Sequence, residues 1–313
     1  TVLLWFLQFA KVQPFHYLYV SLNVVATQSK INITKVAQLK GHRDAIYDFI
    51  VDFEGRHIYS AGAEGYVVRW DMDSPTDGKL IMQTGEPIYS IHKKKNILLV
   101  GGRSGTIYQV DLENKSLLQT DKKHQGGVFI ITDDFSGGED GCIVHHSKSL
   151  KETVSTHSLR SVAFGKSSIF VGSSDSHIYQ LDKNTFKTER ILKGHTNSVF
   201  GLALLDDATL VSTGRDAKIL AHDLHLNQVV HQVPAHLYQV KNLSWNGQFL
   251  LSCSMDKTIK VWNEQLTLLK VIDYDRYKGH TNCINKTLWI DENMFVSCSD
   301  DRTLVFWKVE IID

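Results

Sequence analysis

One twelve-residue phrase recurs seven times along this 313-residue chain and constrains the fold more than any other feature. Its clearest copies begin at Ser252 and Ser297, and each joins a short apolar run, a polar turn and an alternating run. A regular period of 20 to 50 residues indicates a repeat architecture. The eleventh position recurs at intervals of 40, 36, 35, 41, 40 and 45 residues, and it holds Trp70, Val110, His146, Leu181, His222, Trp262 and Trp307.

Each copy of the phrase predicts a β-sheet. The apolar run 249–251 is typical of a strand, and the alternating run 258–262 is typical of a strand that returns after a tight turn. A second polar turn then leads to a fourth strand. Because a lone four-stranded sheet cannot bury both faces, we expect an all-β fold in which seven antiparallel blades pack around an axis as a β-propeller. One turn position is polar in every copy and holds Glu64, Ser104, Asp140, Asp175, Asp216, Asp256 and Asp301.

Gly-His pairs precede several copies of the phrase, at 41–42, 194–195 and 279–280, and Ala235-His236 holds the same place in the sixth copy. This spacing of Gly-His, Ser, Asp and Trp resembles the WD40-repeat family over about residues 31–313. The resemblance implies a seven-bladed propeller with four-stranded blades. Segments 41–47 and 60–71 also resemble those of short bacterial WD40-repeat proteins.

The resemblance further implies a hydrogen-bonded His-Ser-Asp-Trp network inside a blade. A buried imidazole and a buried indole N–H each need a polar partner. Blade five has His222 at the Trp position, blades two to four lack Trp, and His124 and His157 match the His position only loosely, so we expect incomplete networks there. Complete sets are His42, Ser60, Glu64 and Trp70 in blade one, His236, Ser252, Asp256 and Trp262 in blade six, and His280, Ser297, Asp301 and Trp307 in blade seven.

The two ends of the chain predict how the propeller closes. The last copy of the phrase supplies only three strands, and the alternating segment 31–39 can supply the fourth and so remove an open sheet edge. We therefore divide the chain into an N-terminal extension, residues 1–30, and a single propeller domain, residues 31–313. Residues 1–25 are apolar, but Gln8, Lys11 and Pro14 make them a poor membrane span. They are interpreted as an extension, an artefact of the assigned start, or a signal peptide that would make the protein secreted.

Composition argues against several kinds of partner. Lys plus Arg and Asp plus Glu both count 34, and a chain without net charge has no global field to hold nucleic acid. The four cysteines form no CxxC pair, which favours reduced core thiols and a cytoplasmic protein. No HExxH motif occurs, and the glycine-rich segments 101–105 and 137–141 fall in repeat turns, so we expect no metal and no cofactor.

Two columns of the repeat lie on the top face of the propeller in the WD40 family. The residue before the turn acid is Ala63, Arg103, Glu139, Ser174, Arg215, Met255 and Asp300. The second column is the residue after the apolar position that follows the Gly-His pair. It aligns as Tyr47, Tyr89, Phe129, Ala163, Phe200, Lys241 and Asn285. Aromatic residues and Arg are enriched at the energetic centres of interfaces, although the rings could equally pack between blades. The candidate binding residues are Tyr47, Tyr89, Arg103, Phe129, Phe200, Arg215, Lys241, Met255 and Asp300.

These observations predict a non-catalytic scaffold, monomeric by itself, that binds a protein or peptide on its top face. No nucleic acid is expected, and no membrane unless residues 1–25 anchor the chain. The alternative is an enzyme of hydrolase or lyase type that uses the central funnel, since the fold alone excludes no activity. Such an enzyme requires carboxylates or histidines with shifted pKa values that converge on the funnel.

Overall fold

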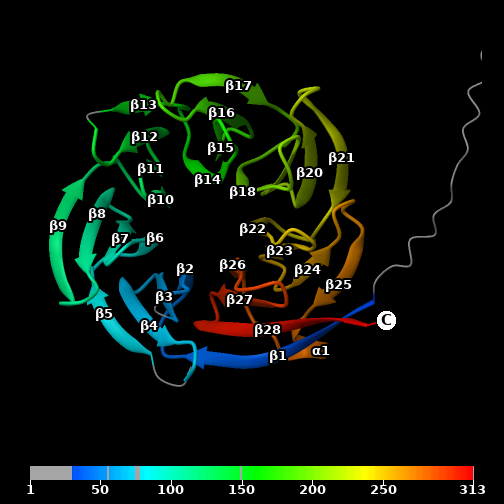
Figure 1. The fold of residues 1–313 in the computed structure, drawn as a ribbon, viewed down its shortest axis with the longest axis horizontal. Helices are drawn as coiled ribbons and strands as arrows, with labels where there is room; N and C mark the ends of the chain where they lie inside the picture. The colour runs from blue at the N-terminus through cyan, green and yellow to red at the C-terminus, as the bar shows by residue number, and fades with distance from the viewer. Residues whose placement is uncertain (1–29, 55, 75–77, 149, 313) are drawn as a thin grey trace, which may run out of the picture.

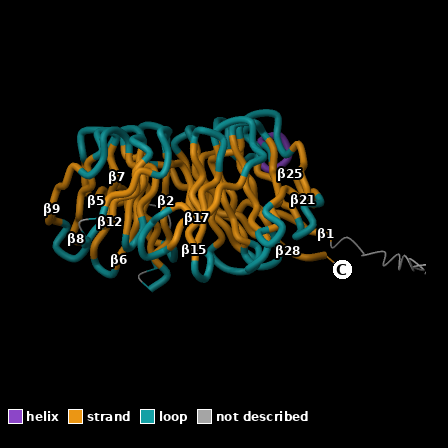
Figure 2. The backbone as a smooth tube through the Cα atoms, turned by 90° about the horizontal axis from the view of Figure 1, so that it is seen from above, coloured by secondary structure: helices purple, strands orange, loops and turns teal. Residues whose placement is uncertain are grey.

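A computed structural model describes residues 30–54, 56–74, 78–148 and 150–312. Seven four-stranded antiparallel sheets surround a central axis (Figure 1), which confirms the predicted seven-bladed propeller. Seen from the side, the strands form a disc whose two faces carry the loops (Figure 2). The predicted extension falls almost wholly outside the described residues. No helix among the described residues is long and apolar enough to cross a bilayer.

The first four blades follow the chain order, each from an inner strand to an outer strand. Blade one contains β2 (Ile46–Asp52), β3 (His57–Gly62), β4 (Tyr66–Asp71) and β5 (Lys79–Gln83). Blade two contains β6 (Ile88–Lys94), β7 (Ile97–Gly102), β8 (Thr106–Asp111) and β9 (Ser116–Lys122). Blade three contains β10 (Val128–Ile131), β11 (Phe135–Gly138), β12 (Cys142–His145) and β13 (Lys151–Thr153). Blade four contains β14 (Leu159–Phe164), β15 (Ser168–Ser173), β16 (Ile178–Asp182) and β17 (Thr188–Leu192).

The remaining blades repeat this order until the last one, which takes its outer strand from the other end of the chain. Blade five contains β18 (Val199–Leu204), β19 (Thr209–Gly214), β20 (Lys218–Asp223) and β21 (Gln228–Pro234). Blade six contains β22 (Val240–Trp245), β23 (Leu250–Ser254), β24 (Ile259–Trp262) and β25 (Leu268–Ile272), and the short helix α1 (Tyr274–Tyr277) follows it. Blade seven contains β26 (Ile284–Trp289), β27 (Met294–Ser299), β28 (Thr303–Ile312) and β1 (Lys30–Lys40).

The closing strand pairs as the sequence predicts. Strand β1 runs antiparallel to β28 from Lys30 opposite Ile312 to Lys40 opposite Thr303, with a bulge between Lys35 and Ala37. The first and last strands therefore lie side by side, blue beside red in Figure 1. This pairing covers the edge of β28 and joins the two ends of the described chain in one sheet.

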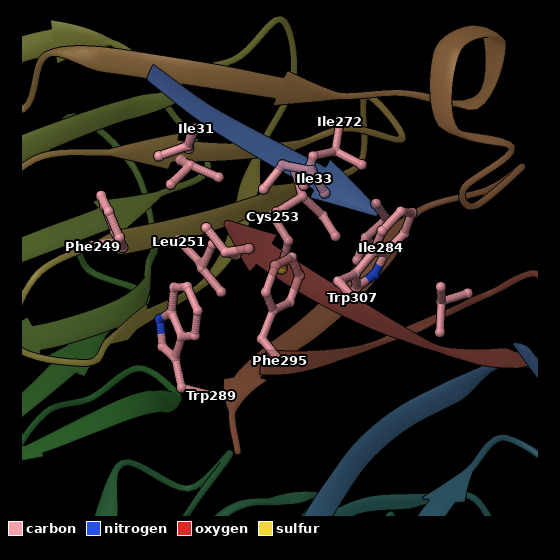
Figure 3. Close-up of a cluster of buried hydrophobic side chains, with 14 residues drawn as sticks. Ile31, Ile33, Phe249, Leu251, Cys253, Ile272, Ile284, Trp289, Phe295 and Trp307 are labelled. Atoms are coloured by element: carbon pink, nitrogen blue, oxygen red, sulfur yellow. The ribbon is translucent and has the colours of Figure 1, made fainter. Parts of the chain in front are cut away.

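Side chains of neighbouring blades form the core. Between blades six and seven, Ile31 and Ile33 of the closing strand pack in one cluster with Trp289, Phe295 and Trp307 (Figure 3). The rings of Phe295 and Trp307 are stacked with their centroids 6.1 Å apart. The closing strand is thus held by apolar burial as well as by backbone hydrogen bonds.

Candidate functional site

Blades one, six and seven each contain a four-residue hydrogen-bonded network. In blade seven, His280 Nδ1 lies 2.9 Å from Asp301 Oδ2, and its Nε2 lies 2.8 Å from Ser297 Oγ. The same hydroxyl accepts the indole N–H of Trp307 at 2.8 Å. These bonds tie the loop before the inner strand to the second and third strands of the blade. Equivalent bonds join His236, Ser252, Asp256 and Trp262 in blade six and His42, Ser60, Glu64 and Trp70 in blade one.

The networks hold charged carboxylates beside histidines. Burial alone would raise the pKa of Asp301, but hydrogen bonds from His280 and Thr303 outweigh it and bring that pKa to about 2. The same balance lowers the pKa of Asp256, while burial lowers the pKa of the His236 imidazole. These titratable groups therefore serve to join backbone segments inside the blade.

Blades three and five contain networks that the tryptophan column did not predict. In blade five, Ser212 contacts His195 at 2.8 Å and His222 at 2.7 Å, so a second imidazole stands at the position of the indole. In blade three, His124 contacts Asp140 and Ser136, both at 2.8 Å. His146 occupies the Trp position there, and its buried Nε2 has no hydrogen-bond partner among the described residues.

In blade two the acid of the network comes from the loop before the inner strand instead of from the turn. Glu86, from the loop before the inner strand, accepts the backbone N–H of Ser104 at 2.6 Å and the phenol of Tyr108 at 2.7 Å. Burial and the bond to Glu86 raise the pKa of Tyr108 to about 12. The acid thus comes from the loop and the neutral partner from the turn, opposite to blade seven. The sequence analysis looked for the acid at the turn position and therefore did not predict this network.

Blade four uses a serine in the place of the histidine. Asp175 accepts hydrogen bonds from Ser155 Oγ and from the phenol of Tyr179, both at 2.6 Å. The loose match of His157 to the histidine column is therefore wrong, because its ring hydrogen-bonds Thr156 Oγ1 and joins no network among the described residues. This blade has no Gly-His pair, so the alignment of the repeat copies had no marker for the position of its loop.

The top face of the propeller carries the loops before the inner strands and the turns between the second and third strands. One backbone hydrogen bond joins loop to turn in each of the seven blades. In each blade, the N–H of the residue before the turn position donates to a loop carbonyl at 2.8–3.1 Å. The carbonyl lies two residues before a bulge that interrupts each inner strand. The donor-to-acceptor pairs are Ala63 to Ala45, Arg103 to Pro87, Glu139 to Gly127, Ser174 to Ser158, Arg215 to Ser198, Met255 to Gln239 and Asp300 to Cys283.

The bulges correct one member of the second column. Every inner strand shifts register by one residue. In the six blades other than blade four, the extra residue is the predicted column member. In blade four the shift lies between Leu159 and Ser161, so the member is Arg160. The alignment that placed Ala163 there is wrong, since Ala163 lies further along β14, opposite Phe170. The missing Gly-His pair moved that alignment by three residues.

The bulge residues touch one another in chain order around the channel. The ring centroids of Tyr47 and Tyr89 are 5.7 Å apart, and those of Tyr89 and Phe129 are 5.1 Å apart and stacked. The Arg160 Cζ lies 3.9 Å from the Phe129 centroid and 5.3 Å from the Phe200 centroid. We call Tyr47, Tyr89, Phe129, Arg160, Phe200 and Lys241 the rim belt; its last contact joins Lys241 Nζ to the Phe200 ring at 5.4 Å.

The rim belt lines a central cavity of 640 Å³ to which all seven inner strands contribute. Its members are half-buried, so each ring packs on a neighbour and still meets the cavity. Met255 and Asp300 also line it. Asn285, the bulge residue of blade seven, donates hydrogen bonds to Asp300 at 2.7 Å and to the carbonyl of Ile46 in blade one at 2.8 Å. The predicted residues Arg103 and Arg215 are exposed at the turns and do not line the cavity.

Four segments match the family model described as "WD domain, G-beta repeat": residues 33–71, 186–223, 227–263 and 273–308. The chain is a WD40-repeat β-propeller. The matched segments hold the third strands of blades one, five, six and seven. The unmatched stretch 72–185 contains blades two and three and the first three strands of blade four, where no tryptophan completes the network.

One known protein is similar to this WD40 propeller in sequence, and one solved structure is similar in fold. The guanine nucleotide-binding protein subunit beta-1 of Caenorhabditis briggsae is 23% identical over 138 residues, which are 43% of this chain and 41% of that subunit. The WD40 beta propeller domain of Doa1 superposes with a TM-score of 0.77 at 22% identity, over 88% of this chain and 97% of that domain. The second likeness shows the fold alone. The narrower resemblance to short bacterial proteins stays a prediction.

The WD40 propeller also carries exposed apolar side chains that the repeat columns missed. Leu237 is 85% exposed and Tyr238 is 61% exposed, and both lie in the loop that enters β22 on the top face. Met255, which the first column did include, lies on the neighbouring turn and is 48% exposed. Their signal in the sequence was an apolar pair in a loop beside His236. This apolar patch adjoins Lys241 of the rim belt, which lies on β22.

Several titratable groups with shifted pKa values lie inside the blades of this WD40 propeller, and others line the cavity. Burial lowers the pKa values of three network histidines, His42, His124 and His236, and none of the three lines the cavity. Around the cavity, burial raises the pKa of Tyr47 and brings that of Cys283 to about 11, so both groups remain protonated and poorly nucleophilic at neutral pH.

Proposed function

We propose that this WD40 propeller is a non-catalytic scaffold that binds a protein or peptide partner on its top face. The observation that carries the proposal is the rim belt, a contiguous series of half-buried aromatic and cationic side chains at the mouth of the cavity. Half-buried rings held in fixed positions lose little conformational entropy when a partner covers them. Aromatic and Arg side chains in such positions are typical binding hot spots.

The apolar patch of Leu237, Tyr238 and Met255 extends this surface onto the top of blade six. A partner that enters the cavity would cover the patch as well, and burial of these side chains would stabilise the complex. The Caenorhabditis briggsae relative is by its name a subunit, which supports a protein partner here. We further propose that the chain is monomeric by itself and cytoplasmic, the latter because its four cysteines are free and buried.

The test uses a displayed library of random peptides, selected on the purified chain. We expect peptides whose binding is lost when Leu237→Asp or Tyr238→Ala is introduced. The matched control is Leu226→Asp, because Leu226 is 63% exposed and lies at the opposite end of β21 from Leu237, and hence on the opposite face. Selected peptides should bind the control variant with unchanged Kd.

Two results would contradict the proposal. Selected peptides that bind equally well to the Leu237→Asp and Tyr238→Ala variants would move the binding surface away from the top face. Mass spectrometry of peptides after prolonged incubation would detect cleavage or elimination, and such products would favour the enzyme alternative over a scaffold.

A further inference from the structure

Arg160 is a member of the rim belt whose guanidinium lacks a hydrogen-bond or ion-pair partner among the described residues. Its guanidinium lies between the rings of Phe129 and Phe200. It makes no hydrogen bond and no ion pair with any other residue in the described part of the chain. A guanidinium has five N–H donors and no acceptor, so an anion or water must satisfy them. Since Arg160 lines the cavity, those donors are within reach of a bound molecule.

A second unpaired cation, Lys241, contacts the same Phe200 ring, with its Nζ 5.4 Å from the ring centroid. That Nζ makes no hydrogen bond or ion pair with another described residue. The third cation of the cavity behaves differently, because Lys286 Nζ is paired with Asp48 Oδ1 at 2.6 Å. Arg160 and Lys241 thus contact one ring and both line the cavity.

Among the charged side chains that line the cavity, cations exceed acids by one, and Glu139, outside the lining, favours the charged form of Arg160. Arg160, Lys241 and Lys286 line it together with two acids, Asp48 and Asp300. Asp48 is paired with Lys286, and Asp300 accepts a hydrogen bond from Asn285. One further negative charge would neutralise the lining. A dianion such as phosphate would meet the two fixed carboxylates and leave the cavity with an excess of negative charge.

We propose that Arg160 and Lys241 form a subsite for one carboxylate of the bound partner, either an acidic side chain or a free C-terminus. The inference rests on the proposed function and names the chemistry of that partner. A carboxylate is planar and accepts two parallel N–H bonds from a guanidinium. Burial lowers the pKa of Arg160, and a bound carboxylate would offset that effect by favouring the charged form.

The binding test compares small probes that differ in one charged group. N-acetylglutamate α-amide presents a side-chain carboxylate, N-acetylalanine presents a terminal one, and N-acetylglutamine α-amide is the neutral isostere. Kd values come from ligand-observed NMR, and in the ¹⁵N-labelled chain the Arg160 Nε–H resonance, assigned by its absence from Arg160→Lys, reports the place of binding. We expect saturable binding of at least one carboxylate, a shift of this resonance, and no saturable binding of the neutral isostere. The tighter of the two carboxylates identifies the source.

Variants of the intact chain test the residues. Arg160→Gln should weaken carboxylate binding about tenfold or more, as expected for the loss of a charge-assisted bond. Lys241→Gln should weaken it as well, and it keeps the test valid if Arg160→Gln does not fold. Arg215→Gln is the matched control, since Arg215 is exposed on the same face and outside the cavity lining, and binding should not change.

The proposal fails if the neutral isostere binds as tightly as the carboxylates, if neither Arg160→Gln nor Lys241→Gln changes the Kd, or if inorganic phosphate binds more tightly than either carboxylate. Its failure is separable from that of the proposed function. Selected peptides that depend on Leu237 and Tyr238 but not on Arg160 would refute the subsite alone. Carboxylate binding in a chain that selects no peptide would refute the scaffold alone.

Discussion

His222 Nε2 lies 2.7 Å from Ser212 Oγ, at the position where a tryptophan N–H reaches the equivalent serine in blades one, six and seven. Blade five therefore keeps the hydrogen bond of the repeat while replacing an indole that does not titrate with an imidazole that does. Burial, and then repulsion from His195, lower the pKa of His222 to about 4. This replacement makes the stability of the blade depend on pH.

The pH dependence has a definite sign. The unfolded chain takes up a proton on His222 below its ordinary pKa near 6.5, while the folded chain does so only near 4. Stability from this residue is therefore complete above about pH 6.5 and falls as the pH is lowered toward 4. We expect His222→Gln to remove about 2 kcal/mol of the loss in unfolding free energy between pH 7 and pH 5, measured by urea denaturation. An unchanged difference between the two pH values would show that His222 does not titrate as described.

The tryptophans of the networks should dominate local stability. Trp307 is fully buried, stacks on Phe295 and donates to Ser297. We expect Trp307→Ala to reduce the free energy of unfolding by roughly 3–5 kcal/mol, the usual loss for a large buried aromatic. Trp307→Phe keeps much of the ring packing and removes the donor, so its loss should be smaller. Equal melting temperatures for wild type and Trp307→Ala would contradict the buried position of the ring.

Closure of the ring by β1 gives a matched pair of substitutions. Ile33 is buried in the cluster between blades six and seven, whereas Val36, three residues later in the same strand, is 53% exposed at the bulge. We expect Ile33→Asp to reduce stability by more than about 3 kcal/mol, because it buries an unpaired charge. Val36→Asp should change stability by less than about 0.5 kcal/mol. Similar losses for both variants in denaturant titrations would argue against the packing of β1.

Contacts within the rim belt should appear as energetic coupling. Arg160 lies over the ring of Phe129, and cation–π pairs of this kind contribute about 0.5–2 kcal/mol. A double-mutant cycle with Phe129→Ala and Arg160→Gln should measure a coupling in that range. The control cycle pairs Phe129→Ala with Arg215→Gln, residues of different blades with no ring contact, and its coupling should be close to zero. Coupling of equal size in both cycles would mean that the belt contacts contribute nothing specific.

Periodicity alone was enough to predict the propeller and its closure. Seven copies of one phrase require seven equivalent sheets, and a last copy with three strands requires a strand from elsewhere, which β1 supplies opposite β28. The networks of blades six and seven were predicted from the resemblance to the WD40 family, because each of their positions keeps the residue type and the spacing of that family. Local chemistry repeated at one period leaves few arrangements that bury both faces of each sheet.

One member of the rim belt, Arg160, was decided by the tertiary structure, whereas the other five were aligned from the sequence. A one-residue bulge sets which side chain of an inner strand points to the channel, and in blade four no Gly-His pair marks where that bulge falls, so Arg160 was missed. Glu86 was missed because its blade exchanges the sides of acid and partner, a change that only contact between loop and turn reveals. The exposure of Leu237 and Tyr238 likewise depends on how a loop lies over blade six. Sequence determines which residues recur, but register and loop path determine which of them meet, because one residue of shift turns a side chain to the opposite face of its strand.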